Sequence, residues 1–126
     1  MKYEDARTAI DWLCLAFGFE RHLVVEGDGT IIEHAQLTFH GGMIMLGSVR
    51  ASPFDELQKP PRATNRIVTQ SAYIIVSDVD AHYRQALSVG AEIVLEPEDQ
   101  HYGGRAYSCR DPEGHLWNFG SYDPWV

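Results

Sequence analysis

The chain has 126 residues, of which 44% are hydrophobic and 22% charged, and its formal net charge is −8. This length and composition are typical of one small domain of a soluble globular protein. No basic face is present to bind nucleic acid, and no apolar run reaches the roughly 20 residues of a membrane helix. We therefore expect no interaction with nucleic acid or with a membrane. Two cysteines without a paired spacing or a secretory signal predict a cytoplasmic protein without a disulfide framework.

The first half of the sequence predicts a helix among short strands. Apolar residues recur at three- and four-residue spacing over residues 5–17, which indicates an amphipathic helix. Asp5 is its expected N-cap, and Gly18 is expected to follow its last turn. Alternating apolar residues and glycine-containing turns predict the strands around it. These strands are residues 1–4, 19–26, 30–39 and 43–47.

The second half predicts the same order of elements after a connecting segment. Residues 49–69 contain three prolines and no periodicity, and they are longer than most loops, which indicates a linker or a functional flap. Asp78 is the expected N-cap of a second helix that ends at Gly90. Pro97 is expected to end the strand that follows this helix. The predicted strands are residues 70–77, 91–95, 105–110 and 115–122.

The two halves share a sequence phrase as well as an order of elements. Residues 18–20 (GFE) match residues 90–92 (GAE), each directly after a helix, which indicates a duplication. We therefore predict one α+β domain of two βαβββ modules, residues 1–48 and 70–126. The strands would form a curved mixed sheet around a cleft, with the helices on its outer face. Alternate side chains of each strand would then point into the cleft.

Four phrases, residues 4–20, 34–48, 76–94 and 102–124, have a recognisable pattern, above all the R-D-P-E-G-H turn followed by W-x-F in the last of them. With these phrases the sequence resembles the vicinal-oxygen-chelate superfamily, which includes glyoxalase I, extradiol dioxygenases, fosfomycin-resistance enzymes and bleomycin-binding proteins. The resemblance covers nearly the whole chain. It implies paired βαβββ modules around a cleft, commonly assembled as a homodimer.

The resemblance also shows which residues of this chain stand at the metal-ligand positions of the family. In metal-dependent members His, Gln or Glu side chains from four strands hold a divalent ion. The matching positions here are Met45 (or Leu46, one residue later), Ala72 and Asn118, and the fourth falls before residue 1. Neither Met nor Ala supplies a hard donor, and a single Asn is a weak ligand. The resemblance therefore implies a protein with no metal ion, no other cofactor and no catalytic residue of the family type.

The alternation of side chains along each strand indicates further candidate ligand-binding residues. Trp117 and Phe119 should face the helices and join the core, whereas their neighbours should face the cleft. Single histidines are weak signals, and we expect His82 and His115 at the surface. Residues near the loop at 96–105 could contact a ligand. The predicted ligand-binding residues are Met45, Ala72, Ile74, Leu116, Asn118, His34, His101, Tyr102 and Arg105.

These residues favour a metal-independent protein that binds a small hydrophobic or cationic compound, as bleomycin-resistance-type binders do. The predicted pocket is mostly apolar with one amide, which is typical of binding more than of hydrolysis. One alternative is a glyoxalase- or dioxygenase-like lyase or isomerase with a displaced metal site, built from Glu33, His34, His40 or His101. A second alternative is a domain that binds a partner protein through residues 49–69.

Overall fold

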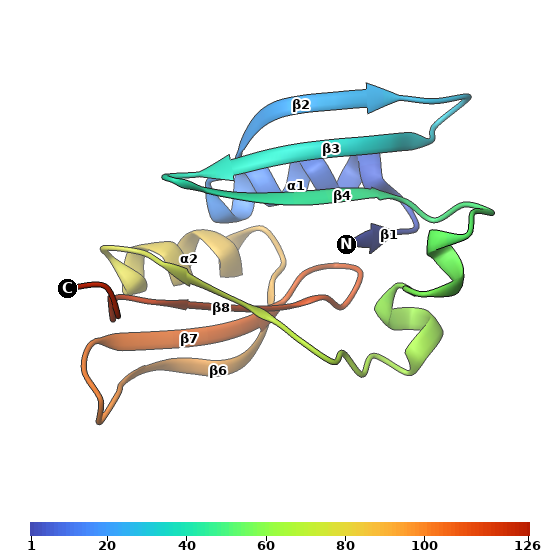
Figure 1. Ribbon diagram of the computed structural model, residues 1–126. Coiled ribbons are helices and arrows are strands. Elements are labelled where there is room, and N and C mark those ends of the chain that lie inside the picture. Colours follow the sequence, from blue (N-terminus) through green and yellow to red (C-terminus); the bar gives the residue numbers. More distant parts are fainter.

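The computed structural model describes residues 1–126 and consists of two βαβββ modules joined by a long segment (Figure 1). The first module contains β1 (Lys2–Tyr3), α1 (Ala6–Phe17), β2 (Glu20–Glu26), β3 (Ile32–Phe39) and β4 (Gly42–Ser48). The second contains β5 (Ala72–Ile75), α2 (Val79–Ser88), β6 (Glu92–Asp99), β7 (Arg105–Arg110) and β8 (Leu116–Gly120). The predicted α+β class and the duplication are confirmed.

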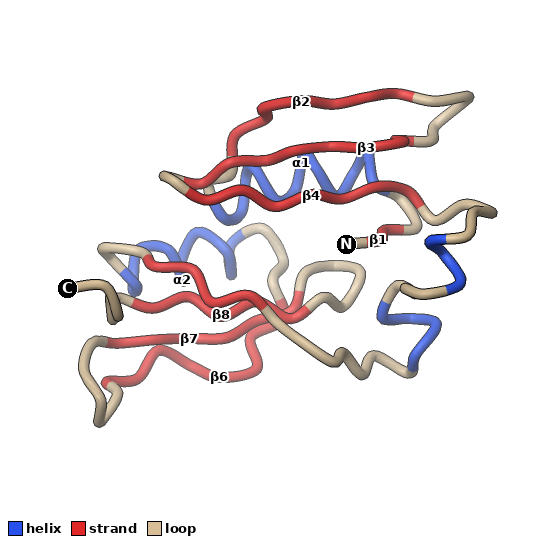
Figure 2. Tube along the Cα trace, viewed as in Figure 1, coloured by secondary structure: helices blue, strands red, loops and turns tan.

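Each module forms its own four-stranded mixed sheet. The strand orders are β1-β4-β3-β2 and β5-β8-β7-β6, and in each sheet the first strand of the module pairs in parallel with the last. Both helices lie behind the sheets in Figures 1 and 2, so the other face of each sheet carries no helix. We call these helix-free surfaces the open faces of the two modules. Neither helix has the length and apolar character that crossing a membrane requires.

Both helices begin where the sequence predicts. The carboxylate of Asp5 accepts a hydrogen bond from the backbone N–H of Thr8, and that of Asp78 does the same for Ala81. Such side chains satisfy N–H groups that have no partner within the helix. Gly18 ends α1 with a φ of 87°, a left-handed conformation that favours glycine.

The strand that contains Pro97 differs from its prediction. β6 continues through Pro97 to Asp99 instead of ending before it. β6 is an edge strand, and its pairing with β7 is irregular between Leu95 and Glu98. A proline is tolerated there because its missing N–H is not needed by a neighbouring strand.

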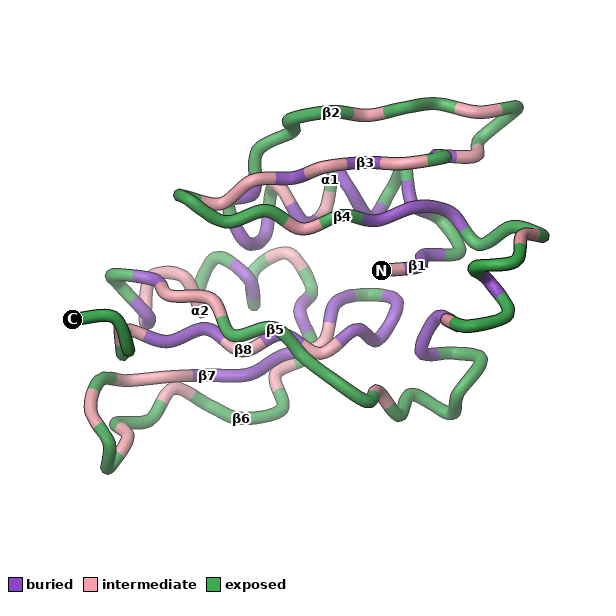
Figure 3. Tube along the Cα trace, viewed as in Figure 1, coloured by how far each residue is buried: buried purple, intermediate pink, exposed green.

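One core of twenty buried hydrophobic residues joins the two modules. Figure 3 shows buried positions in α1 and in the inner strands β3, β4, β7 and β8, whereas the outer strands β2 and β6 are largely exposed. The ring of Phe17, at the end of α1, lies with its centroid 5.4 Å from Trp117 and 4.6 Å from Phe119. Both β8 residues are fully buried, so their predicted place in the core is confirmed.

The turn between β7 and β8 contacts the start of the chain. The buried carboxylate of Asp111 accepts hydrogen bonds from the hydroxyl of Tyr3 (2.6 Å) and from Nε1 of Trp117 (3.0 Å). His115 donates from Nε2 to the carbonyl of Lys2 at 2.8 Å. The predicted surface position of His115 is therefore wrong, because its partner lies in the other module and local sequence does not reveal it.

Residues 49–69 are fixed against the first module. They contain two short 3₁₀ turns, Phe54–Glu56 and Pro61–Thr64. Asp55 is buried and pairs with Nζ of Lys2 at 2.8 Å, while its carboxylate accepts further hydrogen bonds from the Ser52 hydroxyl and the Arg50 backbone. These hydrogen bonds, first of all that from Lys2, hold the pKa of Asp55 well below its usual value. Residues 49–69 are therefore an ordered segment held against the first module and not a loose linker.

His82 on α2 also lies between the modules, and its predicted surface position is wrong. Its Nε2 donates to the carbonyl of Phe17 at 2.9 Å, and its Nδ1 accepts from the hydroxyl of Tyr107 at 2.7 Å. This arrangement suits a neutral imidazole with the proton on Nε2. Burial lowers the pKa of His82, and the hydrogen bond to Phe17 opposes that effect only in part.

Stability is therefore expected to fall in mildly acidic solution. Because the pKa of His82 is lower in the folded chain than in the unfolded chain, the unfolded chain binds the proton first as pH decreases. Stability is full above the unfolded pKa of about 6.5 and is lost as pH falls from there toward the folded pKa.

We expect His82→Gln to reduce this pH dependence and to lower the unfolding free energy at about pH 7.5 by about 1–3 kcal/mol. Urea denaturation at about pH 7.5 and about pH 5.5 measures both effects. The matched control is His101→Gln, because His101 is exposed. An unchanged pH dependence in His82→Gln would contradict this assignment.

Candidate functional site

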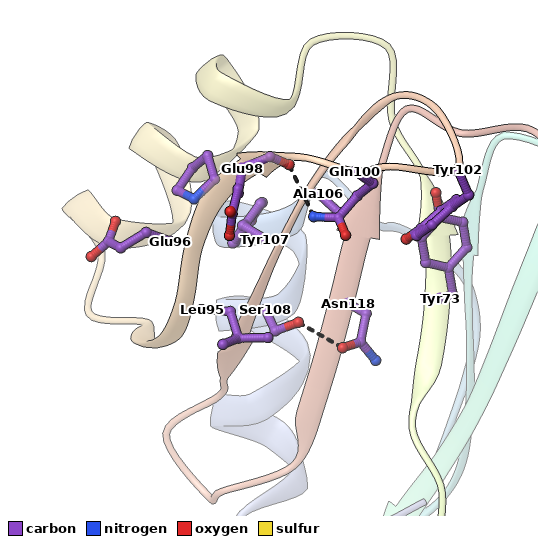
Figure 4. Close-up of a pocket in the computed structure, with 11 residues that line it drawn as sticks. Tyr73, Leu95, Glu96, Glu98, Gln100, Tyr102, Ala106, Tyr107, Ser108 and Asn118 are labelled. Atoms are coloured by element: carbon purple, nitrogen blue, oxygen red, sulfur yellow. Dashed lines mark hydrogen bonds between the residues drawn. The ribbon is translucent and has the colours of Figure 1, made fainter.

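A hollow of about 620 Å³ lies on the open face of the second module (Figure 4). We call it the tyrosine hollow. Its floor comes from β5, β7 and β8, and its side from β6 and the turn that follows. Its lining residues are Tyr73, Leu95, Glu96, Pro97, Glu98, Gln100, Tyr102, Ala106, Tyr107, Ser108 and Asn118.

Strand register decides which side chains face this hollow. Tyr73 lies opposite Asn118 in the β5–β8 pair, whereas Ala72 lies opposite the core residue Trp117. Residues opposite each other share a face and successive residues alternate, so Ala72 and Ile74 belong to the helix side. Their predicted place beside Asn118 is wrong by one residue. Ser71 lies on the side of Asn118, since its hydroxyl accepts a hydrogen bond from Nδ2 of Asn118 at 2.9 Å.

The amide of Asn118 is held by its neighbours on both sides. Its Oδ1 accepts from the hydroxyl of Ser108 at 2.7 Å, a bond drawn in Figure 4. Its Nδ2 donates to Ser71 and also to the carbonyl of Ala72 at 2.9 Å. Leu116, two residues before Asn118, shares its strand face, as predicted from alternation.

The residues present do not fit the divalent metal site of the family. The positions compared above hold the thioether of Met45, the amide of Asn118 and, with the register corrected, the hydroxyl of Ser71. None of these is a carboxylate or an imidazole, the ligands that divalent ions take in such sites. No group of three or more His, Cys, Asp or Glu side chains is placed to hold a metal ion.

The tyrosine hollow is lined by aromatic and acidic side chains and by no basic one. Tyr73 and Tyr102 are both about half exposed and lie at the same end of the hollow (Figure 4). The carboxylate of Glu96 is directed toward α2, where it accepts a hydrogen bond from the hydroxyl of Tyr83 at 2.7 Å (Figure 4). Glu98 also lines the hollow and forms no ion pair. No lysine, arginine or histidine lines the hollow. Aromatic faces and carboxylates without basic neighbours attract cations.

The hydroxyl of Tyr73 anchors one edge of this hollow. It donates a hydrogen bond to the carbonyl of Tyr122 at 2.9 Å. Burial, and then the nearby hydroxyl of Tyr102, raises the pKa of Tyr73, so the phenol stays protonated and keeps this bond. The rings of Tyr102 and Tyr122 are nearly perpendicular, with their centroids 5.2 Å apart.

A second hollow, of about 800 Å³, is lined by residues of both modules and of the 49–69 segment. We call it the intermodule hollow. Three of the predicted residues, Met45, Ala72 and Leu116, line it together. Asn118 and Tyr102 line the tyrosine hollow instead, and no residue lines both. The structure thus divides the predicted site between two cavities.

The other predicted residues lie outside both hollows. His34 is on the open face of β3, where its Nε2 accepts from Gln36 at 3.1 Å. His101 is exposed in the β6–β7 turn, with its ring 5.4 Å from that of Tyr102. Arg105 donates to Asp80 and Asp99 at 3.1 and 3.2 Å, which directs its charge away from the tyrosine hollow.

The displaced metal site of the alternative hypothesis is not assembled within one chain. Glu33 and His34 are on β3, and the nearest basic group to Glu33 is Arg50 at 4.0 Å. His40 is in the turn at the far end of β3, and His101 belongs to the other module. The two thiols offer no substitute chemistry: burial raises the pKa of Cys109 to about 12, well above that of a reactive thiolate.

Comparison with known proteins identifies the fold. Residues 3–119 match the family described as the Glyoxalase/Bleomycin resistance protein/Dioxygenase superfamily. The uncharacterised protein Mb0911c of Mycobacterium bovis is 36% identical over 119 residues, which cover 93% of this chain and 76% of that protein. TioX from Micromonospora sp. ML1 superimposes with a TM-score of 0.73 at 33% identity, over 95% of this chain and 92% of TioX.

A more distant structure shows how widely the architecture extends. The fosfomycin resistance protein FosX from Listeria monocytogenes, solved with Mn(II) and sulfate, superimposes with a TM-score of 0.69. At 14% identity, over 98% of this chain and 86% of FosX, this likeness concerns the fold alone. The family match and the mycobacterial relative agree with it, and the chain belongs to the Glyoxalase/Bleomycin resistance protein/Dioxygenase superfamily.

Proposed function

We propose that the protein binds a small cationic compound with an aromatic or apolar part in the tyrosine hollow, without a metal ion. The observation that carries this proposal is the lining itself: two half-exposed tyrosines, the carboxylate of Glu98, which forms no ion pair, and no basic residue. A cation over a tyrosine face gains about 0.5–1 kcal/mol at an exposed site. The net charge of −8 also raises the local concentration of cations.

Binding rather than turnover is supported by the polar groups on the floor of the hollow. The hydroxyl of Ser108 donates to Asn118, and no imidazole lies in the hollow to activate it. A nucleophile needs an adjacent base within hydrogen-bond reach. The bleomycin resistance proteins named in the family description give this proposal a precedent within the family.

We further propose a cytoplasmic homodimer. The open face of the first module exposes Leu23, Val25 and Met43, each between 37% and 43%. Pairing this face with the tyrosine hollow of a second copy would cover apolar surface on both copies and enclose the bound compound. Sedimentation equilibrium is expected to give the mass of two chains.

Titration with ethidium, a cationic aromatic probe, tests the binding proposal. We expect one ethidium per chain and an affinity that EDTA does not change. Glu98→Gln is expected to weaken binding roughly two- to fivefold, as removal of one exposed ionic contact does. Tyr102→Ala is expected to weaken it roughly threefold to tenfold through loss of the ring face.

The matched control is Glu56→Gln, because Glu56 is exposed on the 49–69 segment, forms no ion pair and lines neither hollow. Both glutamate variants change the net charge equally. Equal effects of the two variants, or loss of binding in EDTA, would overturn the proposal.

A further inference from the structure

We propose that the intermodule hollow is a second ligand site, and that it takes an amphiphilic monoanion: one carboxylate or sulfonate group on an apolar body. This inference does not rest on the proposed function, because the two hollows share no lining residue. Their charges also differ in sign, so they would select different compounds.

The walls of the intermodule hollow are apolar and come from three parts of the chain. Met45 belongs to β4, and Leu116 belongs to β8. The 49–69 segment adds Phe54, Leu57 and Ile67, whose side chains are exposed by 57%, 82% and 68%. Large apolar side chains that gather around one hollow on a charged surface mark a binding site.

The polar lining of the hollow suits an anionic head group. No aspartate or glutamate lines it, although the chain carries 18 such residues. Lys59 lines it and forms no ion pair, whereas Lys2, the other lysine, is paired with Asp55. The remaining polar lining consists mainly of hydroxyl and amide groups, which can donate hydrogen bonds to an anion. Most of the surface would repel the same anion.

The 49–69 segment, which carries Lys59, is held in place by its own contacts without a ligand. Asp55 anchors it to Lys2, and Arg62 pairs with Glu4 at 3.1 Å. The hydroxyl of Thr64 donates to the carbonyl of Ile67 at 2.8 Å, which holds the end of the segment over the hollow. A preformed site binds more tightly because less conformational entropy is lost.

Isothermal titration with dodecanoate, kept below its micelle concentration, tests this site. We expect one dodecanoate per chain, bound more tightly than dodecanol or dodecyltrimethylammonium. Lys59→Glu is expected to weaken dodecanoate roughly threefold to tenfold, because it replaces an attraction by a repulsion. Arg84→Glu is the matched control, since Arg84 is exposed on α2, lines neither hollow and forms no ion pair.

A second variant separates this site from the tyrosine hollow. Ile67→Ser removes an exposed apolar wall and is expected to weaken dodecanoate while leaving ethidium binding unchanged. The inference is overturned if Lys59→Glu and Arg84→Glu have equal effects, or if the three dodecyl compounds bind equally. Absence of dodecanoate binding, as when a second copy covers the hollow, would overturn it too.

Discussion

Replacement of Asp111 by alanine is expected to lower the free energy of unfolding by about 3–5 kcal/mol. Its carboxylate is buried and accepts from the hydroxyl of Tyr3, from Nε1 of Trp117, and from the backbone N–H groups of Glu113 and His115. Truncation leaves these four donors without their acceptor in a site that water does not reach. Unpaired buried donors keep their full desolvation penalty.

Urea denaturation followed by circular dichroism measures this loss. Asp28→Ala is the matched control, because Asp28 is exposed in the β2–β3 turn and is expected to change stability by less than about 0.5 kcal/mol. Tyr3→Phe removes one of the four hydrogen bonds and is expected to cost about 1 kcal/mol. Equal stabilities of the Asp111→Ala and Asp28→Ala variants would show that the turn does not hold the modules together.

The parts of the fold that sequence predicted correctly depend on local signals. Asp5 and Asp78 each precede an amphipathic segment, and the side chain that caps a helix lies within three residues of the group it bonds. The left-handed turn at Gly18 is local in the same way. The repeated order of helix and strands then follows from two copies of one pattern.

The binding residues were predicted less well because strand register is not local. Whether Ser71 or Ala72 shares a face with Asn118 depends on how β5 pairs with β8, more than 40 residues away. An error of one residue moves every side chain of a strand to the other face. Tyr73 was missed for that reason, and two-residue alternation from Ser71 would have found it.

Other predictions were wrong because the residues concerned contact groups in the opposite module. His82 bonds to a carbonyl 65 residues away and His115 to one 113 residues away, so neither burial can be seen in its own segment. Glu98 is absent from the predicted binding residues because Pro97 is expected to end the strand before it. An edge strand can contain proline, but only the strand order shows that β6 lies at the edge of its sheet.

Replacement of Phe17 by alanine is expected to lower the free energy of unfolding by about 3–5 kcal/mol, as is typical of a buried phenylalanine. Its ring is 1% exposed and lies against Trp12 of its own helix, Trp117 and Phe119 of β8, and His82 of α2. The cavity would therefore be shared by both modules. Leu15→Ala is the matched control on α1, since Leu15 is 59% exposed.

We propose that residues 1–126 unfold as one domain, and Phe17→Ala tests this by its effect on cooperativity. Tryptophan fluorescence and far-ultraviolet circular dichroism should report one coincident transition, shifted to lower urea. If the two signals separate, with one transition at the wild-type midpoint, the modules are independent units that merely touch. A single shifted transition would mean that neither sheet keeps its shape alone, because the helix side of each is covered by the other module as well as by its own helix.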